Sequence, residues 1–166
     1  MKIKEGHLEF DFLTEHGSRA SQYDKWSFYR NQFINVTKST KAVDFIYIDK
    51  AHDITWLIEV KDYRHPDTQL IKPSELASVV AQKVRDSLAG LAAARCNAND
   101  TEEREFSNAA LRTNKIKVVL HMEQNHPIIN PADILTNLKQ QIKAIDAQPK
   151  VVNQGNLKAN MCWKVV

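Results

Sequence analysis

Hydrophobic residues recur with two different periods along this chain, and these periods predict its strands and helices. Two short runs, 42–48 and 55–60, are rich in β-branched and aromatic residues and are separated by a polar turn. They predict an antiparallel hairpin. Three further runs of the same character predict additional strands at 115–121, 150–152 and 161–166.

Apolar residues at helical spacing predict three helices, at 18–33, 73–95 and 131–145. Pro73 suits the first turn of the second one. The segment 97–112 is polar and contains a short helical patch. The order of elements predicts the α/β class, with a mixed central β-sheet flanked by helices. Because no internal repeat or linker interrupts the pattern, we expect one domain that spans residues 1–166.

Composition and charge exclude several classes of protein without selecting one. The chain is 43% hydrophobic and 26% charged, with a net charge of +3, so neither a disordered nor a membrane protein is expected. Cys96 and Cys162 show no metal-ligand spacing, which argues against a zinc site and favours reduced thiols. The first residues carry acids and a histidine where a secretory signal needs an apolar run. These features predict a cytoplasmic location.

Three charged residues stand out because the predicted hairpin is otherwise apolar. Asp44 interrupts the first strand, while Glu59 and Lys61 share one face at the end of the second. In an antiparallel hairpin the start of one strand lies beside the end of the other, so the three side chains should converge. A carboxylate pair of this kind needs a cation, and its hard oxygens suit magnesium. The structural alternatives are a salt bridge among the three residues or a solvated strand end.

The pattern of Asp44, fourteen intervening residues and Glu59-Val60-Lys61 resembles the PD-(D/E)xK nuclease superfamily, which has the restriction-endonuclease-like fold. The resemblance covers about residues 18–95. The chain departs from the family pattern at one point, because the residue before Asp44 is Val43 and no proline precedes it. The resemblance implies a magnesium-dependent nuclease that hydrolyses phosphodiester bonds, with DNA as the expected substrate. Asp44, Glu59 and the carbonyl of Val60 would hold Mg²⁺, or Mn²⁺ in its place, and Lys61 would position the attacking water.

Further residues are candidates for supporting roles around this site. The resemblance implies an accessory residue on the helix that follows, for which Lys83 is the better candidate because it borders the apolar stripe, and Gln82 the weaker one. Arg64, His65 and Lys41 are candidates for contacts to a phosphate backbone or a base, and a plain surface loop is the alternative for them.

Two other functional hypotheses stay open at this stage. The first is a catalytically inactive member of the same fold that binds nucleic acid or a protein. The second is a nuclease that acts on RNA or is the effector half of a defence or toxin system, since nothing in the sequence identifies the substrate. We also consider a homodimer, although the sequence shows no interface that supports one.

Overall fold

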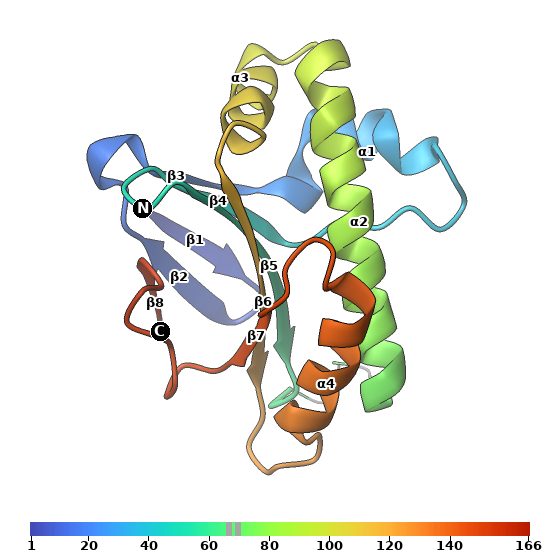
Figure 1. The fold of residues 1–166 in the computed structure, drawn as a ribbon, viewed down its shortest axis with the longest axis vertical. Coiled ribbons are helices and arrows are strands. Elements are labelled where there is room, and N and C mark those ends of the chain that lie inside the picture. Colours follow the sequence, from blue (N-terminus) through green and yellow to red (C-terminus); the bar gives the residue numbers. More distant parts are fainter. Residues whose placement is uncertain (66–67, 69–70) are drawn as a thin grey trace.

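The computed structural model describes residues 1–65, 68 and 71–166 and shows three layers (Figure 1). A five-stranded sheet lies in the middle, the longer helices cover one of its faces, and a three-stranded sheet covers the other. The prediction of an α/β fold with a mixed central sheet and flanking helices is therefore confirmed. Within the described part of the chain, no helix is both long and apolar enough to cross a membrane.

The central sheet has the strand order β3-β4-β5-β6-β7. The first three strands are antiparallel and the last three are parallel, which makes the sheet mixed. The predicted hairpin is confirmed, since Tyr47 pairs with Trp56. The strands are β3 (Arg19–Gln22), β4 (Phe45–Asp49), β5 (Ile54–Asp62), β6 (Lys115–Glu123) and β7 (Lys150–Val152).

The helices begin where capping chemistry predicts. Pro73 opens the longest helix, and the side chains of Asp100 and Asn130 accept hydrogen bonds from backbone N–H groups at the starts of the next two. The α-helices are α1 (Ser27–Asn31), α2 (Pro73–Asn97), α3 (Thr101–Ala110) and α4 (Pro131–Ile142). Short 3₁₀ turns span Glu15–Gly17, Tyr23–Lys25 and Phe33–Asn35.

A second, smaller sheet has the order β1-β2-β8 and brings the two ends of the chain together. Its strands are β1 (Lys2–Glu5), β2 (Leu8–Phe12) and β8 (Trp163–Val165). The turn between β1 and β2 requires a positive φ of 57° at Gly6, a conformation that glycine adopts without strain. Phe10 and Phe12 point from this sheet into a core shared with the central sheet.

Two separate cores result from the alternation of side chains along the central strands. Ile46 and Leu57 face the helices, whereas Phe45, Trp56 and Ile58 face the small sheet. All five side chains are almost fully buried. Because both faces of β4 and β5 are covered, charged side chains on these strands such as Asp49 and Glu59 are buried.

The prediction of one helix over 18–33 is wrong. Residues Arg19–Gln22 form strand β3, which pairs with β4, and α1 covers only Ser27–Asn31. The hydrogen-bonding edge that β4 offers outweighs the helical spacing of the apolar residues. The N-terminal hairpin of β1 and β2 was not predicted either, although Leu8, Phe10 and Phe12 alternate after Gly6 in the pattern of a strand.

Candidate functional site

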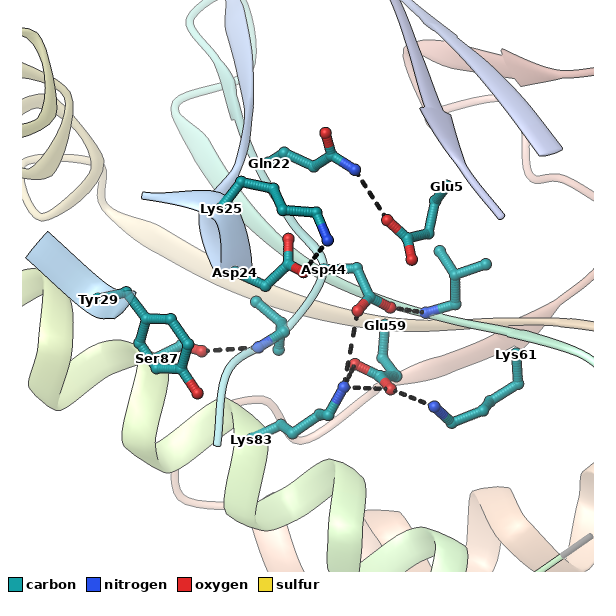
Figure 2. Close-up of polar contacts among 12 residues, drawn as sticks. Glu5, Gln22, Asp24, Lys25, Tyr29, Asp44, Glu59, Lys61, Lys83 and Ser87 are labelled. Carbon is teal, nitrogen blue, oxygen red and sulfur yellow. Dashed lines mark hydrogen bonds and ion pairs between the residues drawn. The ribbon is translucent and has the colours of Figure 1, made fainter. Parts of the chain in front are cut away.

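The hairpin brings Asp44 and Glu59 together, as the sequence predicts (Figure 2). Asp44 directly precedes Phe45, which pairs with Ile58 across the hairpin. The Oδ2 atom of Asp44 accepts a 2.7 Å hydrogen bond from the backbone N–H of Val60. Asp44 and Glu59 therefore lie beside each other on the face of the sheet that α2 covers.

Glu59 is completely buried and is held by two lysines. The ammonium of Lys83, which comes from α2, lies 2.7 Å from each carboxylate oxygen of Glu59. The ammonium of Lys61 lies 2.8 Å from Oε1. Lys83 also approaches Asp44 Oδ1 at 3.6 Å. The structure thus joins four of the candidate residues in one network of ion pairs.

Burial and repulsion control the ionisation of this network. Burial raises the pKa of Asp44 to about 8, and the neighbouring charge of Glu59 adds to this effect. Burial alone would lower the pKa of Lys83, but the charges of Glu59 and Asp44 outweigh it, so its pKa is raised. Near neutral pH, Lys83 is charged and Asp44 is largely held as the neutral acid.

The residues present fit an ammonium better than a magnesium ion. Lys83 reaches into the space between Asp44 and Glu59, where the ion was expected (Figure 2). Mg²⁺ requires six oxygen ligands in an octahedron, and the carboxylates of Asp44 and Glu59 already have the ammonium of Lys83 beside them. Val60 directs its N–H at Asp44, a contact that does not test the expected role of its carbonyl. The ligand roles of Asp44, Glu59 and Val60 stay predictions, and the arrangement of these side chains does not favour a site for Mg²⁺ or Mn²⁺.

The other candidates divide into those near this network and those outside it. Lys83 lies in its centre, whereas the amide of Gln82 donates to the carbonyl of Ser39. The structure therefore separates Gln82 from the acids. Lys41 lies before β4, and its backbone N–H donates to Asp86.

The loop after β5 uses its candidate residues in internal contacts. The guanidinium of Arg64 forms two 2.8 Å hydrogen bonds with Asp62. The ring of His65 stacks on that of His7, with 3.8 Å between the ring centroids. His7 belongs to the turn between β1 and β2, so this stack joins the small sheet to the edge of the site. A cleft of about 250 Å³ lies here, lined among others by Lys61 and His65.

Sequence reasoning missed one acid near the site. Glu5, at the end of β1, adds a small upward contribution to the pKa of Asp44, and its side chain accepts a 2.8 Å hydrogen bond from Gln22 (Figure 2). Glu5 also lines the cleft beside Lys61. The signal that could have found it is the Gly6 turn followed by alternating apolar residues, which marks a hairpin.

Comparison with known proteins finds a curated relative. The chain is 35% identical over 150 residues to a protein of Neisseria meningitidis (serogroup A, serotype 4A) that is named cysteine–tRNA ligase. The match covers 73% of this chain and 21% of the relative, so the chain spans about a fifth of the length of the curated relative it matches. No protein-family model matches the chain. No solved structure matches it either.

The prediction of a PD-(D/E)xK nuclease is wrong, because the relative is by its name a ligase that acts on tRNA. The expectation of an enzyme holds only in the coarse sense that this relative is one. The pattern of Asp44, Glu59 and Lys61 contains only three residues. Buried acids of this kind need cations beside them, whether or not the site catalyses a reaction. Here Lys61 and Lys83 meet that requirement from within the chain. The structural alternative, a salt bridge among these residues, accounts for the contacts.

Proposed function

We propose that this chain is a tRNA-binding module related to the aminoacylation machinery. The observation that carries the proposal is its 35% identity to a cysteine–tRNA ligase. Because the match covers 21% of that relative, the proposal concerns one step, the binding of RNA, and not the complete ligase reaction. The four glycines of the chain are dispersed and provide no Gly-rich loop of the kind that holds nucleotide phosphates.

The cleft beside Lys61 supports this proposal through its chemistry. Proteins recognise single-stranded RNA by stacking its bases on planar side chains and by placing cations against its phosphates. The stacked pair of His7 and His65 offers the planar surface. Lys61 offers the cation, because its ammonium has three donors and Glu59 accepts one of them.

The buried acids would have a positioning role in this function. Glu59 holds the ammonium groups of Lys61 and Lys83 on one side of the sheet. Lys41 lies on the chain that leads into this network and is a candidate for a further phosphate contact. Magnesium forms no part of the proposal, because Lys83 lies where the ion would bind.

Fluorescence anisotropy with labelled tRNA tests this proposal. We expect the chain to bind tRNA more tightly than duplex DNA of similar length, with an affinity that falls as salt rises. His65→Ala should weaken binding by roughly fivefold or more, which is the scale of one stacked base. Lys61→Gln should also weaken binding, because it removes a cation from a phosphate contact. Lys164→Gln is the matched control, because Lys164 is exposed on β8 and lines a different cleft.

Two results would contradict the proposal. One is tighter binding of duplex DNA than of tRNA. The other is equal loss of affinity in Lys61→Gln and Lys164→Gln, which would indicate a diffuse charge effect and no site at the cleft. Light scattering on the same samples determines whether the chain is a homodimer, which stays a prediction.

A further inference from the structure

A second cluster of polar side chains lies at the opposite end of β4 from Asp44. Asp49 is the last residue of β4, His52 lies in the turn to β5, and Cys162 directly precedes β8. Each residue offers one ligand atom, and these three atoms all lie within 4.8 Å of one another. In the part of the chain that the structure describes, this is the group of three such residues that is close enough to share a metal ion.

Asp49 is the unusual member of the cluster, because its carboxylate is buried and 1% exposed. Its ion-pair partner among the described residues is His52, whose Nδ1 atom lies 2.7 Å from Oδ2 and is charged only when the ring is protonated. A carboxylate removed from water needs a cation to balance it. Within the described ranges, Asp49 therefore lacks the permanent counter-charge that the two lysines give to Glu59.

The two oxygens of Asp49 have different neighbours. Oδ1 accepts a 3.2 Å hydrogen bond from the backbone N–H of His52, which fixes the orientation of the carboxylate. Oδ2 faces the other two side chains, with the Sγ atom of Cys162 at 3.5 Å and the ring of His52 at 2.7 Å. The backbone thus holds one oxygen, and the other faces a thiol and an imidazole, which are soft and borderline metal ligands.

We propose that Asp49, His52 and Cys162 bind one divalent metal ion of the zinc class through Oδ2, Nδ1 and Sγ. A thiolate, an imidazole and a carboxylate together suit Zn²⁺ and disfavour Mg²⁺, which prefers oxygen alone. Two ligands of a tetrahedral zinc, one oxygen and one sulfur, lie about 3.6 Å apart at the usual bond lengths. The distance of 3.5 Å between Oδ2 and Sγ matches this value.

The imidazole needs a small movement. A nitrogen and an oxygen on the same zinc lie about 3.4 Å apart, so the ring of His52 would have to withdraw from its hydrogen bond to Asp49. The side chain of His52 is 56% exposed and lies in a turn, which leaves room for this movement. Cys162 also lines a cleft of about 510 Å³, which gives water or a small ligand access to a fourth position.

The sequence argued against a zinc site, and the structure explains why that argument does not apply here. Spacing motifs detect ligands that lie close together in the chain. Cys162 and Asp49 are separated by 113 positions and meet only because the β1-β2-β8 sheet packs on the central sheet. This site is independent of the proposed RNA-binding cleft, so either proposal can fail without the other.

Metal titration of untagged, chelator-treated protein tests the site. We expect one equivalent of Zn²⁺ to bind by calorimetry, and Co²⁺ to give a thiolate-to-metal absorption band. Cys162→Ser and His52→Ala should each lower the affinity at least about tenfold, since even partners outside the ligand set cost that much. Cys162→Ser should also remove the absorption band. Cys96→Ser and His126→Ala, which alter an exposed thiol and an exposed imidazole, are the matched controls.

Three outcomes would overturn the site. Absence of stoichiometric binding to the wild-type chain contradicts it, and so does binding that survives in both Cys162→Ser and His52→Ala. Loss of the band in Cys96→Ser would assign the metal to the other thiol. Because His52 is exposed in a turn, His52→Ala should fold normally, and circular dichroism checks this before the titration.

Discussion

The ammonium of Lys83 lies 2.7 Å from both carboxylate oxygens of Glu59, and this contact ties the longest helix to the central sheet. Glu59 is fully buried in a strand that is otherwise apolar, so it depends on this partner. One helical turn further along α2, the hydroxyl of Ser87 accepts a 3.0 Å hydrogen bond from the backbone N–H of Val43. Polar contacts thus fix α2 over the start of β4 and the end of β5.

Lys83→Met should destabilise the fold by about 3–5 kcal/mol, because it leaves the buried charge of Glu59 with only Lys61 nearby. Urea unfolding followed by circular dichroism measures the loss. Lys2→Met is the matched control, since Lys2 pairs with Glu9 and its side chain is 62% exposed. Breaking an exposed pair should cost less than about 1 kcal/mol.

The double variant Glu59→Leu with Lys83→Met distinguishes a lost partner from lost packing. If the cost arises from an uncompensated carboxylate, removal of that carboxylate should recover most of the stability. If the double variant is as unstable as Lys83→Met, the lysine stabilises the fold through its aliphatic chain. A Lys83→Met variant that unfolds at the wild-type urea concentration would show that the ion pair is not needed.

Asp44→Asn should change how stability depends on pH. The pKa of Asp44 is about 8 in the folded chain, against an ordinary value of 3.8. Between pH about 4 and about 8, the folded chain therefore holds a proton that the unfolded chain has released. The free energy of unfolding must therefore fall as pH rises through this window, by up to about 1.4 kcal/mol per pH unit. Above the folded pKa, the stability that the retained proton of Asp44 contributed is lost.

Urea unfolding of both chains at intervals from pH about 5 to about 9 measures this difference. The asparagine side chain cannot ionise. Its oxygen can still accept the hydrogen bond that the N–H of Val60 donates to Asp44. The variant should therefore gain stability relative to the wild type as pH rises, and be the more stable chain above pH about 8. Titrating groups outside the network of Asp44, Glu59, Lys61 and Lys83 are common to both chains and cancel in the comparison. Two parallel stability curves would show that Asp44 titrates normally.

Local patterns predicted much of this fold because they depend on neighbours in the chain. The hairpin of β4 and β5, the Pro-capped starts of α2 and α4, and β7 at 150–152 all follow from periodicity and capping. The convergence of Asp44, Glu59 and Lys61 follows from antiparallel register alone. Each of these features is set by residues close in sequence or joined by one short turn.

The remaining features depend on contacts between distant segments, which periodicity does not report. Strand β3 forms because β4 offers it a partner, although its residues have helical spacing. Lys83 ranked only as an accessory candidate, yet it lies between the acids because α2 packs on that face of the sheet. The cluster that includes Asp49 and Cys162 needs the small sheet to dock. The functional prediction was wrong for a related reason, since a three-residue pattern identifies a charge network and not a reaction.

Gly90→Ala should destabilise the chain, although alanine normally favours a helix over glycine by about 0.5–1 kcal/mol. Gly90 lies in α2 and is buried against the ring of Phe33 and the hydroxyl of Tyr23. A Cβ atom at this position would clash with that hydroxyl and would lie 3.1 Å from a carbon of Phe33. Overpacking of this kind costs typically about 1–3 kcal/mol, which exceeds the gain in helix propensity.

Tyr23→Phe provides the test of this cause. The hydroxyl of Tyr23 is buried and has no hydrogen-bond partner within the described residues, so its removal alone should leave stability nearly unchanged. Combined with Gly90→Ala, it should restore a large part of the lost stability, because the atom that clashes is gone. Gly155→Ala is the matched control, since a Cβ there meets only the side chain of Asn153 at 3.4 Å. If Gly90→Ala is as harmless as Gly155→Ala, or if Tyr23→Phe does not relieve its cost, then α2 does not approach Tyr23 as closely as the structure shows. The position of Lys83 over Glu59 would then need revision as well, because Lys83 lies on the same helix.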